Sequence, residues 1–303
     1  MKKISLITSV ALIASLGLVG CSGGSGDAAT TATTAASTAK TTADNTLETI
    51  YGTAIDPELQ GATVCLDTNL DENCTEGEPS ATTDENGNFS LKVTTMQLEG
   101  TAPLVAVNGV DKESGEAFKG KLIAAVNSNY QNITPLTTLA YAKIQENIDK
   151  GLADVQSGMS FLQVTLGLSS EAMQENMITL ANEGNETALK VALVLEKSAE
   201  AIVPTNTLQF YKKLSSEINA SKALTLLDSI VKITPTDLKD QVKSLVEGIL
   251  NSDLSDPYAL AEEARTKAIE LGIDQKERME EEIPEEMPVE IPVEIPVKMP
   301  HMP

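Results

Sequence analysis

The stretch from Leu59 to Leu91 constrains the fold most, because alternating apolar residues flank a long acidic interruption. The alternating residues are Ala62, Val64 and Leu66 before the interruption and Phe89, Leu91 and Val93 after it. A period of two predicts β-strands that bury one face. We therefore expect two strands that are joined through an acidic loop and a tight turn at 84–87.

Side chains with oxygen atoms occupy positions one, three, five and twelve of a twelve-residue window in the acidic loop. These residues are Asp67, Asn69, Asp71 and Glu78. Calcium loops of the helix-loop-helix type place their oxygen ligands at this spacing, so Ca²⁺ is the cation that the pattern favours. Glu72 stands at position six, where such loops have a glycine for a sharp turn. The alternative is a solvated acidic turn without a metal, because Asp and Asn side chains readily bond to turn backbone.

The N-terminus has the pattern of an export signal. Lys2 and Lys3 precede an apolar run over residues 4–18, and Leu18-Val19-Gly20-Cys21 follows. This arrangement resembles a bacterial lipoprotein signal with its lipobox, which implies cleavage before Cys21 and attachment of fatty acids such as palmitate to that residue. Ser22 after the lipidated cysteine favours the outer membrane in a bacterium with two membranes.

The chain has three cysteines, and lipidation of Cys21 would leave Cys65 and Cys74. In an exported protein such a pair is expected to form a disulfide, which would stabilise the fold by about 2.5 to 3 kcal/mol. The cysteine pair fits a zinc or redox site less well than a disulfide. Its spacing is not C-x-x-C, and the single histidine, His301, lies near the C-terminus.

The residues between Gly61 and Leu91 also resemble a known family. The order G-A-T-V-C-L-D-x-N, then Cys74, then G-E-P-S-A-T-T-D-x-N-G-x-F-S-L is similar to the carboxypeptidase-regulatory-like, or transthyretin-like, domain of bacterial surface lipoproteins. The segment Asn132–Leu139 resembles the continuation of the same group. This resemblance covers residues 50–140 approximately. It implies a Greek-key β-sandwich that is a binding or structural module and not an enzyme.

Periodicity predicts an α+β, multidomain fold in which an all-α helical domain follows the sandwich. The expected strands are 49–55, 62–66, 89–93, 104–107 and 122–126, with a further candidate at 116–119. The expected helices are 135–150, 154–166, 170–180, 186–203, 206–218, 221–233, one that opens at Thr234-Pro235, and one that opens at Asp256-Pro257 and ends at Gly272. The helix at 188–203 is apolar on most sides and is expected to be central in a helical bundle.

These features divide the chain into five segments. They are a signal peptide (1–20), a flexible Gly/Ser/Ala/Thr tether (21–46), the β-sandwich (47–130), the helical domain (131–275) and an acidic Pro-rich tail (276–303). In the tail, proline recurs at every fourth residue, which predicts an extended chain. The tail is interpreted as a disordered end or, alternatively, as a docking strip.

Composition excludes several classes of function. A net charge of −22 argues against binding to nucleic acid or to anionic lipid headgroups. A single histidine makes a Ser-His-Asp triad implausible, and phosphate-cradling motifs are missing from the sequence. We therefore expect a lipid-anchored, non-catalytic envelope lipoprotein that binds a surface protein or polysaccharide, or that is a structural component. The alternatives are a scaffold that recruits an exported partner through its helices and tail and, more remotely, an enzyme of unrecognised type.

Overall fold

The computed structural model describes the chain at residues 46–56, 58–98, 101–112, 115–126, 128–149, 155–169, 175–204, 206–218 and 225–272. The expected signal peptide, the lipidation site Cys21, nearly all of the tether and the Pro-rich tail lie outside these residues. The described residues all belong to one compact unit.

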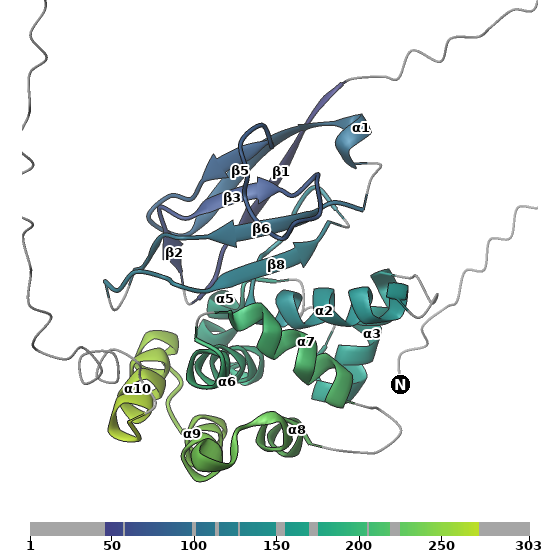
Figure 1. Ribbon diagram of the computed structural model, residues 1–303. Helices are drawn as coiled ribbons and strands as arrows, with labels where there is room; N and C mark the ends of the chain where they lie inside the picture. The colour runs from purple at the N-terminus through teal and green to yellow at the C-terminus, as the bar shows by residue number, and fades with distance from the viewer. Residues whose placement is uncertain are drawn as a thin grey trace, which may run out of the picture. The chain divides into compact units, whose positions relative to one another are not determined.

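Antiparallel strands form the N-terminal part of this unit (Figure 1). They are β1 (Leu47–Thr53), β2 (Leu59–Gln60), β3 (Thr63–Leu66), β4 (Ser80–Thr82), β5 (Asn88–Thr94), β6 (Pro103–Val107), β7 (Val110–Asp111) and β8 (Lys121–Ala125), with a short helix α1 (Thr95–Leu98) after β5. One sheet has the order β4-β3-β6-β8, while β1 pairs with β5 and β2 with β7. The strands predicted at 49–55, 62–66, 89–93, 104–107 and 122–126 are confirmed within two residues at their ends.

The alternation that predicted these strands also places the core of the sheets. In β5, Phe89, Leu91 and Val93 are buried while Ser90 and Lys92 are exposed. Ile50 of β1 lies opposite Leu91, and these residues share one core with apolar side chains of β3, β6 and β8. This shared core holds the β1–β5 pair and the four-stranded sheet together.

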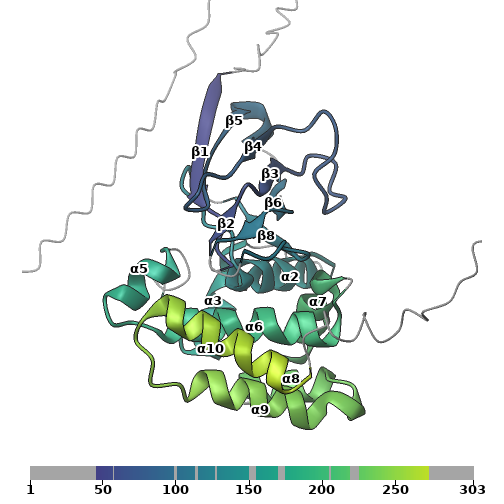
Figure 2. The ribbon, with the colours of Figure 1, turned by 90° about the vertical axis from the view of Figure 1, so that its left-hand side faces the viewer.

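Helices form the C-terminal part of the described chain. They are α2 (Pro135–Asp149), α3 (Val155–Leu166), α5 (Met177–Asn182), α6 (Thr187–Ile202), α7 (Thr207–Glu217), α8 (Leu226–Ile233), the 3₁₀ helix η2 (Thr236–Leu238), α9 (Lys239–Leu250) and α10 (Pro257–Glu270). Helix α6 is buried along most of its length, as its apolar sequence predicted, and α2, α5, α7, α9 and α10 all pack against it (Figure 2).

Two helix N-termini are capped as the sequence predicted. The backbone N–H of Thr137 donates to the Thr134 hydroxyl before α2, and that of Ala259 donates to the Asp256 side chain before α10.

Helix α2 joins the helical core to the sheet. It packs against β8 on one side and against α3, α6 and α7 on others, so residues 135–142 are all buried. The Thr138 hydroxyl oxygen accepts a hydrogen bond from Ile123 N (2.9 Å), and the Thr137 hydroxyl donates to Ile123 O (3.1 Å). The two threonines therefore satisfy backbone groups of β8 at the contact between strands and helices.

Several predicted elements differ from the structure. The candidate strand at 116–119 is not a strand in the structure. Its only β pairing among the described residues is an isolated bridge between Ala117 and Val110. Thr234-Pro235 does not open an α-helix: Thr234 ends α8, and the 3₁₀ turn η2 precedes α9. In the predicted helix 170–180, residues 170–174 lie outside the described ones, and α5 begins only after Asn176 caps it through its side chain. The short strands β2, β4 and β7 were not predicted.

The described chain is therefore an α+β protein with antiparallel strands in small sheets. None of its described helices is long and apolar enough to cross a membrane.

Candidate functional site

The acidic loop follows β3 and leads into β4, and its own backbone folds around the carboxylate of Asp67. This side chain is completely buried. Its Oδ1 accepts a hydrogen bond from Asp71 N (3.1 Å), and its Oδ2 accepts one from Glu72 N (2.8 Å). Burial raises the pKa of Asp67, although the two backbone donors oppose this change. Asp67 is therefore the internal support of the loop.

The middle of the loop is a succession of side-chain turns. Asn69 Oδ1 accepts from Asp71 N (3.0 Å), and Asp71 Oδ1 accepts from Asn73 N (2.8 Å). Glu72, at the position where a glycine is usual, adopts a left-handed backbone with φ of 62°. The chain thus makes the sharp turn without glycine, at the conformational cost that a side chain brings there.

Glu78 closes the loop from its C-terminal end. Its Oε1 accepts from Thr68 N (2.8 Å) and its Oε2 accepts from Thr75 N (2.9 Å). Partial burial would raise the pKa of Glu78, but the backbone donors of Thr75, Thr68 and Asn69 outweigh it and lower this pKa. Both oxygens of the carboxylate therefore already bind backbone of the loop.

The four predicted calcium ligands lie in this one loop, and their donor atoms are the hard oxygens that Ca²⁺ prefers. The structure brings Asp67 and Asn69 together at the backbone N–H of Asp71, while the carboxylate of Glu78 accepts from the backbone of Thr68 and Thr75 on either side of the loop. Within the described residues, no three His, Cys, Asp or Glu side chains are grouped as for a bound metal. Calcium binding by all four residues would therefore require Glu78 to exchange backbone donors for the ion, and the site stays a prediction.

The predicted disulfide is present between Cys65 and Cys74, whose Cα atoms are 5.5 Å apart. It anchors the loop to the sheet, because Cys65 is a residue of β3 and Cys74 is in the loop. Cys65 is completely buried in a cluster with Val105 and Ile123 of the sheet, Tyr141 of α2 and Leu208 of α7, and Cys74 packs against this cluster. The disulfide thus lies where the sheet meets the helices, a position that the sequence did not reveal.

Ion pairs and hydrogen bonds attach the loop to its surroundings. Lys212 of α7 contacts both carboxylate oxygens of Glu72, at 2.7 and 2.9 Å. Lys121 of β8 donates to Asn73 Oδ1 (2.8 Å). Burial raises the pKa of Tyr141 to about 12, and the negative charges of Glu72 and Asp67 add to this shift. The loop therefore connects the sheet to both α2 and α7.

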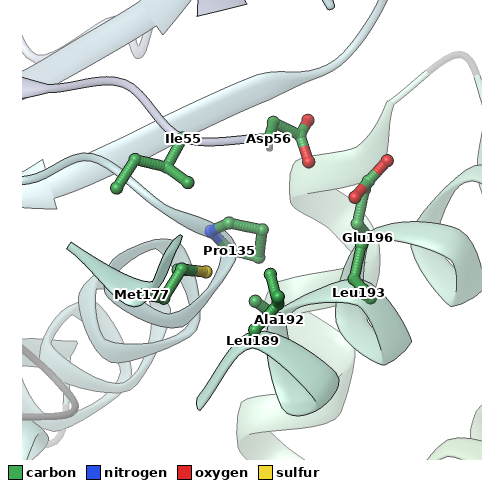
Figure 3. A pocket seen from close by; sticks show the side chains of 8 residues that line it. All are labelled: Ile55, Asp56, Pro135, Met177, Leu189, Ala192, Leu193 and Glu196. Carbon is green, nitrogen blue, oxygen red and sulfur yellow. The ribbon is translucent and has the colours of Figure 1, made fainter. Parts of the chain in front are cut away.

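A second cluster of buried charged groups lies beneath the turn between β1 and β2 (Figure 3). Asp56 in this turn and Glu196 of α6 line a small apolar pocket, and both are buried. Glu196 forms an ion pair with Lys197, which also contacts Glu200 Oε2 at 3.2 Å. Sequence reasoning missed this cluster because its acids are 140 positions apart and share no local pattern.

Neither a protein-family model, a curated protein nor a solved structure matches this chain.

Proposed function

We propose that this protein is a non-catalytic lipoprotein of the bacterial cell envelope, anchored by a lipid on Cys21. The observation that carries the proposal is the disulfide between Cys65 and Cys74. Disulfides persist in oxidising compartments outside the cytosol, so the bond agrees with the export signal read from residues 1–21. Lipidation would also account for the third cysteine. With Ser22 next to it, the anchor would hold the protein at the outer membrane.

We further infer that the strands form a transthyretin-like Greek-key sandwich. In support, β1 and β5 share one apolar core with the four-stranded sheet, as two layers of a sandwich do. The acidic loop would then be a structural joint that fastens this sandwich to α2 and α7. Calcium, held by Asp67, Asn69, Asp71 and Glu78, would neutralise the crowded carboxylates of the joint.

Replacement of the anchor residue tests the proposal directly. The Cys21→Ser variant is expected to lose incorporation of a fatty-acid probe and to leave the membrane fraction, because the lipobox sulfur is the attachment point. Cys74→Ser is the matched control, since it replaces a cysteine outside the lipobox, breaking the disulfide to Cys65, and is expected to remain lipidated. A Cys21→Ser protein that still carries the probe in its native host would refute the proposed anchor.

A second candidate function, binding of a surface polysaccharide, is favoured by two exposed tyrosines. Tyr51 of β1 and Tyr130 pair in a parallel bridge, and their side chains are 52% and 56% exposed. Ser90 lies opposite Tyr51 in β5 and is also exposed. Exposed aromatic residues at neighbouring backbone positions, with a serine hydroxyl opposite one of them, offer both stacking surface and hydrogen bonds to a sugar chain.

The double variant Tyr51→Ala/Tyr130→Ala is expected to lose most retention of the protein on the insoluble polysaccharide of its own envelope. Removal of two stacking contacts of roughly 1 kcal/mol each would weaken binding by about 30-fold. A pull-down against the purified polysaccharide measures this change. Met96→Ala, which truncates another exposed apolar side chain, is the control and is expected to bind normally. Equal retention of the double variant and the native protein would remove the polysaccharide from consideration.

A further inference from the structure

Two carboxyl groups face each other inside the protein where the chain passes from the sheet to the helices. Figure 3 shows Asp56 and Glu196 directed toward one another at the edge of the pocket. The other residues that line it are Ile55, Pro135, Met177, Leu189, Ala192 and Leu193. Asp56 is 4% exposed and Glu196 is 6% exposed. Both acids are therefore removed from the water that would screen their charges.

One oxygen of each carboxyl group has no donor. Asp56 Oδ1 and Glu196 Oε2 are buried and have no hydrogen-bond partner among the described residues. A buried acceptor without a donor is costly, and two buried anions that face each other repel as well. One added proton would remove both penalties, because a protonated carboxyl donates a hydrogen bond to its ionised neighbour.

The surrounding charges agree with one proton on this pair. Lys197 supplies one positive charge beside Glu196. Glu200, also on α6, is about half exposed to water and is paired with the same lysine. Tyr211 of α7 is a neutral phenol, since burial and the charges of Asp56, Glu196 and Glu200 raise its pKa well above the usual value. With one proton, the buried group of Asp56, Glu196 and Lys197 has no net charge.

We propose that Asp56 and Glu196 share one proton, and that this acid pair is a pH-sensitive latch that holds the β1–β2 turn on helix α6. Asp56 is the donor in the latch, and Glu196 Oε2 is the acceptor. Ala54 belongs to the core of the sheets, whereas Ile55 already belongs to the helical core. The latch therefore acts at the residue where the chain changes from one core to the other.

The direction of the pH dependence follows from the environment of Asp56. Burial, and next the charge of Glu196, raise the pKa of Asp56 well above its ordinary value of 3.8. The folded protein thus keeps a proton that the unfolded chain releases. The stability from the latch is complete below pH 3.8, and it is lost progressively as the pH rises toward the pKa of the folded state.

The Asp56→Asn variant distinguishes the effect of the shared proton on stability from the effect of side-chain packing. The amide of asparagine has nearly the same shape, donates to Glu196 at every pH and cannot ionise. We expect the melting temperature of the full-length variant in detergent to exceed that of the native protein. The difference should grow from about pH 5 to about pH 8 and reach on the order of 5 °C. Asp237→Asn, at an exposed aspartate, is the control and is expected to give a gap that does not change with pH.

Infrared spectroscopy of the native protein provides an independent test that needs no variant to fold. At about pH 6 the protein is expected to show the carbonyl band of a neutral carboxylic acid, which ordinary aspartates and glutamates no longer show there. Asp56→Asn should remove that band. A constant melting gap, or the absence of the band in the native protein, would overturn the latch. Stabilisation by an added cation that Asp56→Asn abolishes would overturn it too, because a metal would then hold the pair.

Discussion

Loss of the Cys65–Cys74 disulfide is expected to lower the free energy of unfolding by about 3 kcal/mol, and the melting temperature by on the order of 10 °C. The bond joins residues nine positions apart, and closing a ring of this size contributes about 2.7 kcal/mol by the loop-entropy relation. Packing adds to this effect, because Cys65 is buried in one cluster with Tyr141 and Leu208 of the helices and Cys74 packs against this cluster.

The measurement compares the oxidised native protein with the Cys65→Ala/Cys74→Ala variant in urea unfolding and in thermal melts. Native protein treated with a reductant is the matched control, because it loses the bond but keeps both sulfur atoms. The reduced protein should retain the packing contribution and should therefore fall between the other two. Oxidised and reduced proteins of equal stability would show that the disulfide does not support the joint between sheet and helices.

Calcium is expected to raise the melting temperature by a comparable amount. Extracellular calcium modules bind with dissociation constants down to about 0.1 mM, and such a site would gain about 2.7 kcal/mol at a hundredfold excess of free ion. The gain arises because the ion would neutralise carboxylates that crowd into residues 67–78 and that repel one another without it. Differential scanning calorimetry with and without Ca²⁺ measures the shift.

Two variants locate the calcium effect. Asp71→Ala removes an exposed predicted ligand and is expected to abolish the calcium-dependent shift. Glu76→Ala removes an exposed acid of the same loop outside the predicted ligand set, so the shift should remain. Mg²⁺ at the same concentration is expected to give a much smaller shift, since it demands a tighter octahedral site. A melting temperature that calcium does not change would exclude the site.

The local features of the fold could be predicted from the sequence because local chemistry decides them. Alternation in 89–93 has the same period as the pleat, and it fixes which face of β5 is buried. The Asp256-Pro257 pair marks the start of α10, since the aspartate accepts from a free N–H and proline needs no partner there. The cysteine pair could be predicted because the proposed lipidation of Cys21 leaves only Cys65 and Cys74.

The contacts that make the site could not be predicted, because they depend on how distant elements pack. The Thr137 and Thr138 side chains look like ordinary helix residues until β8 is placed against them. Glu72 looks like a departure from a calcium loop, yet it is the residue that pairs with Lys212 of α7. Asp56 and Glu196 line one pocket because of how α6 packs beneath the β1–β2 turn, and no periodicity in the sequence connects them.

Intact mass spectrometry of the protein from its native membranes, alkylated without reduction, tests the proposed identity most directly. We predict a chain that begins at an acylated Cys21 and takes up no alkylating reagent, because Cys65 and Cys74 are joined. Alkylation of both of these thiols in a chain that still has residues 1–20 would contradict export, the lipid anchor and the envelope function together.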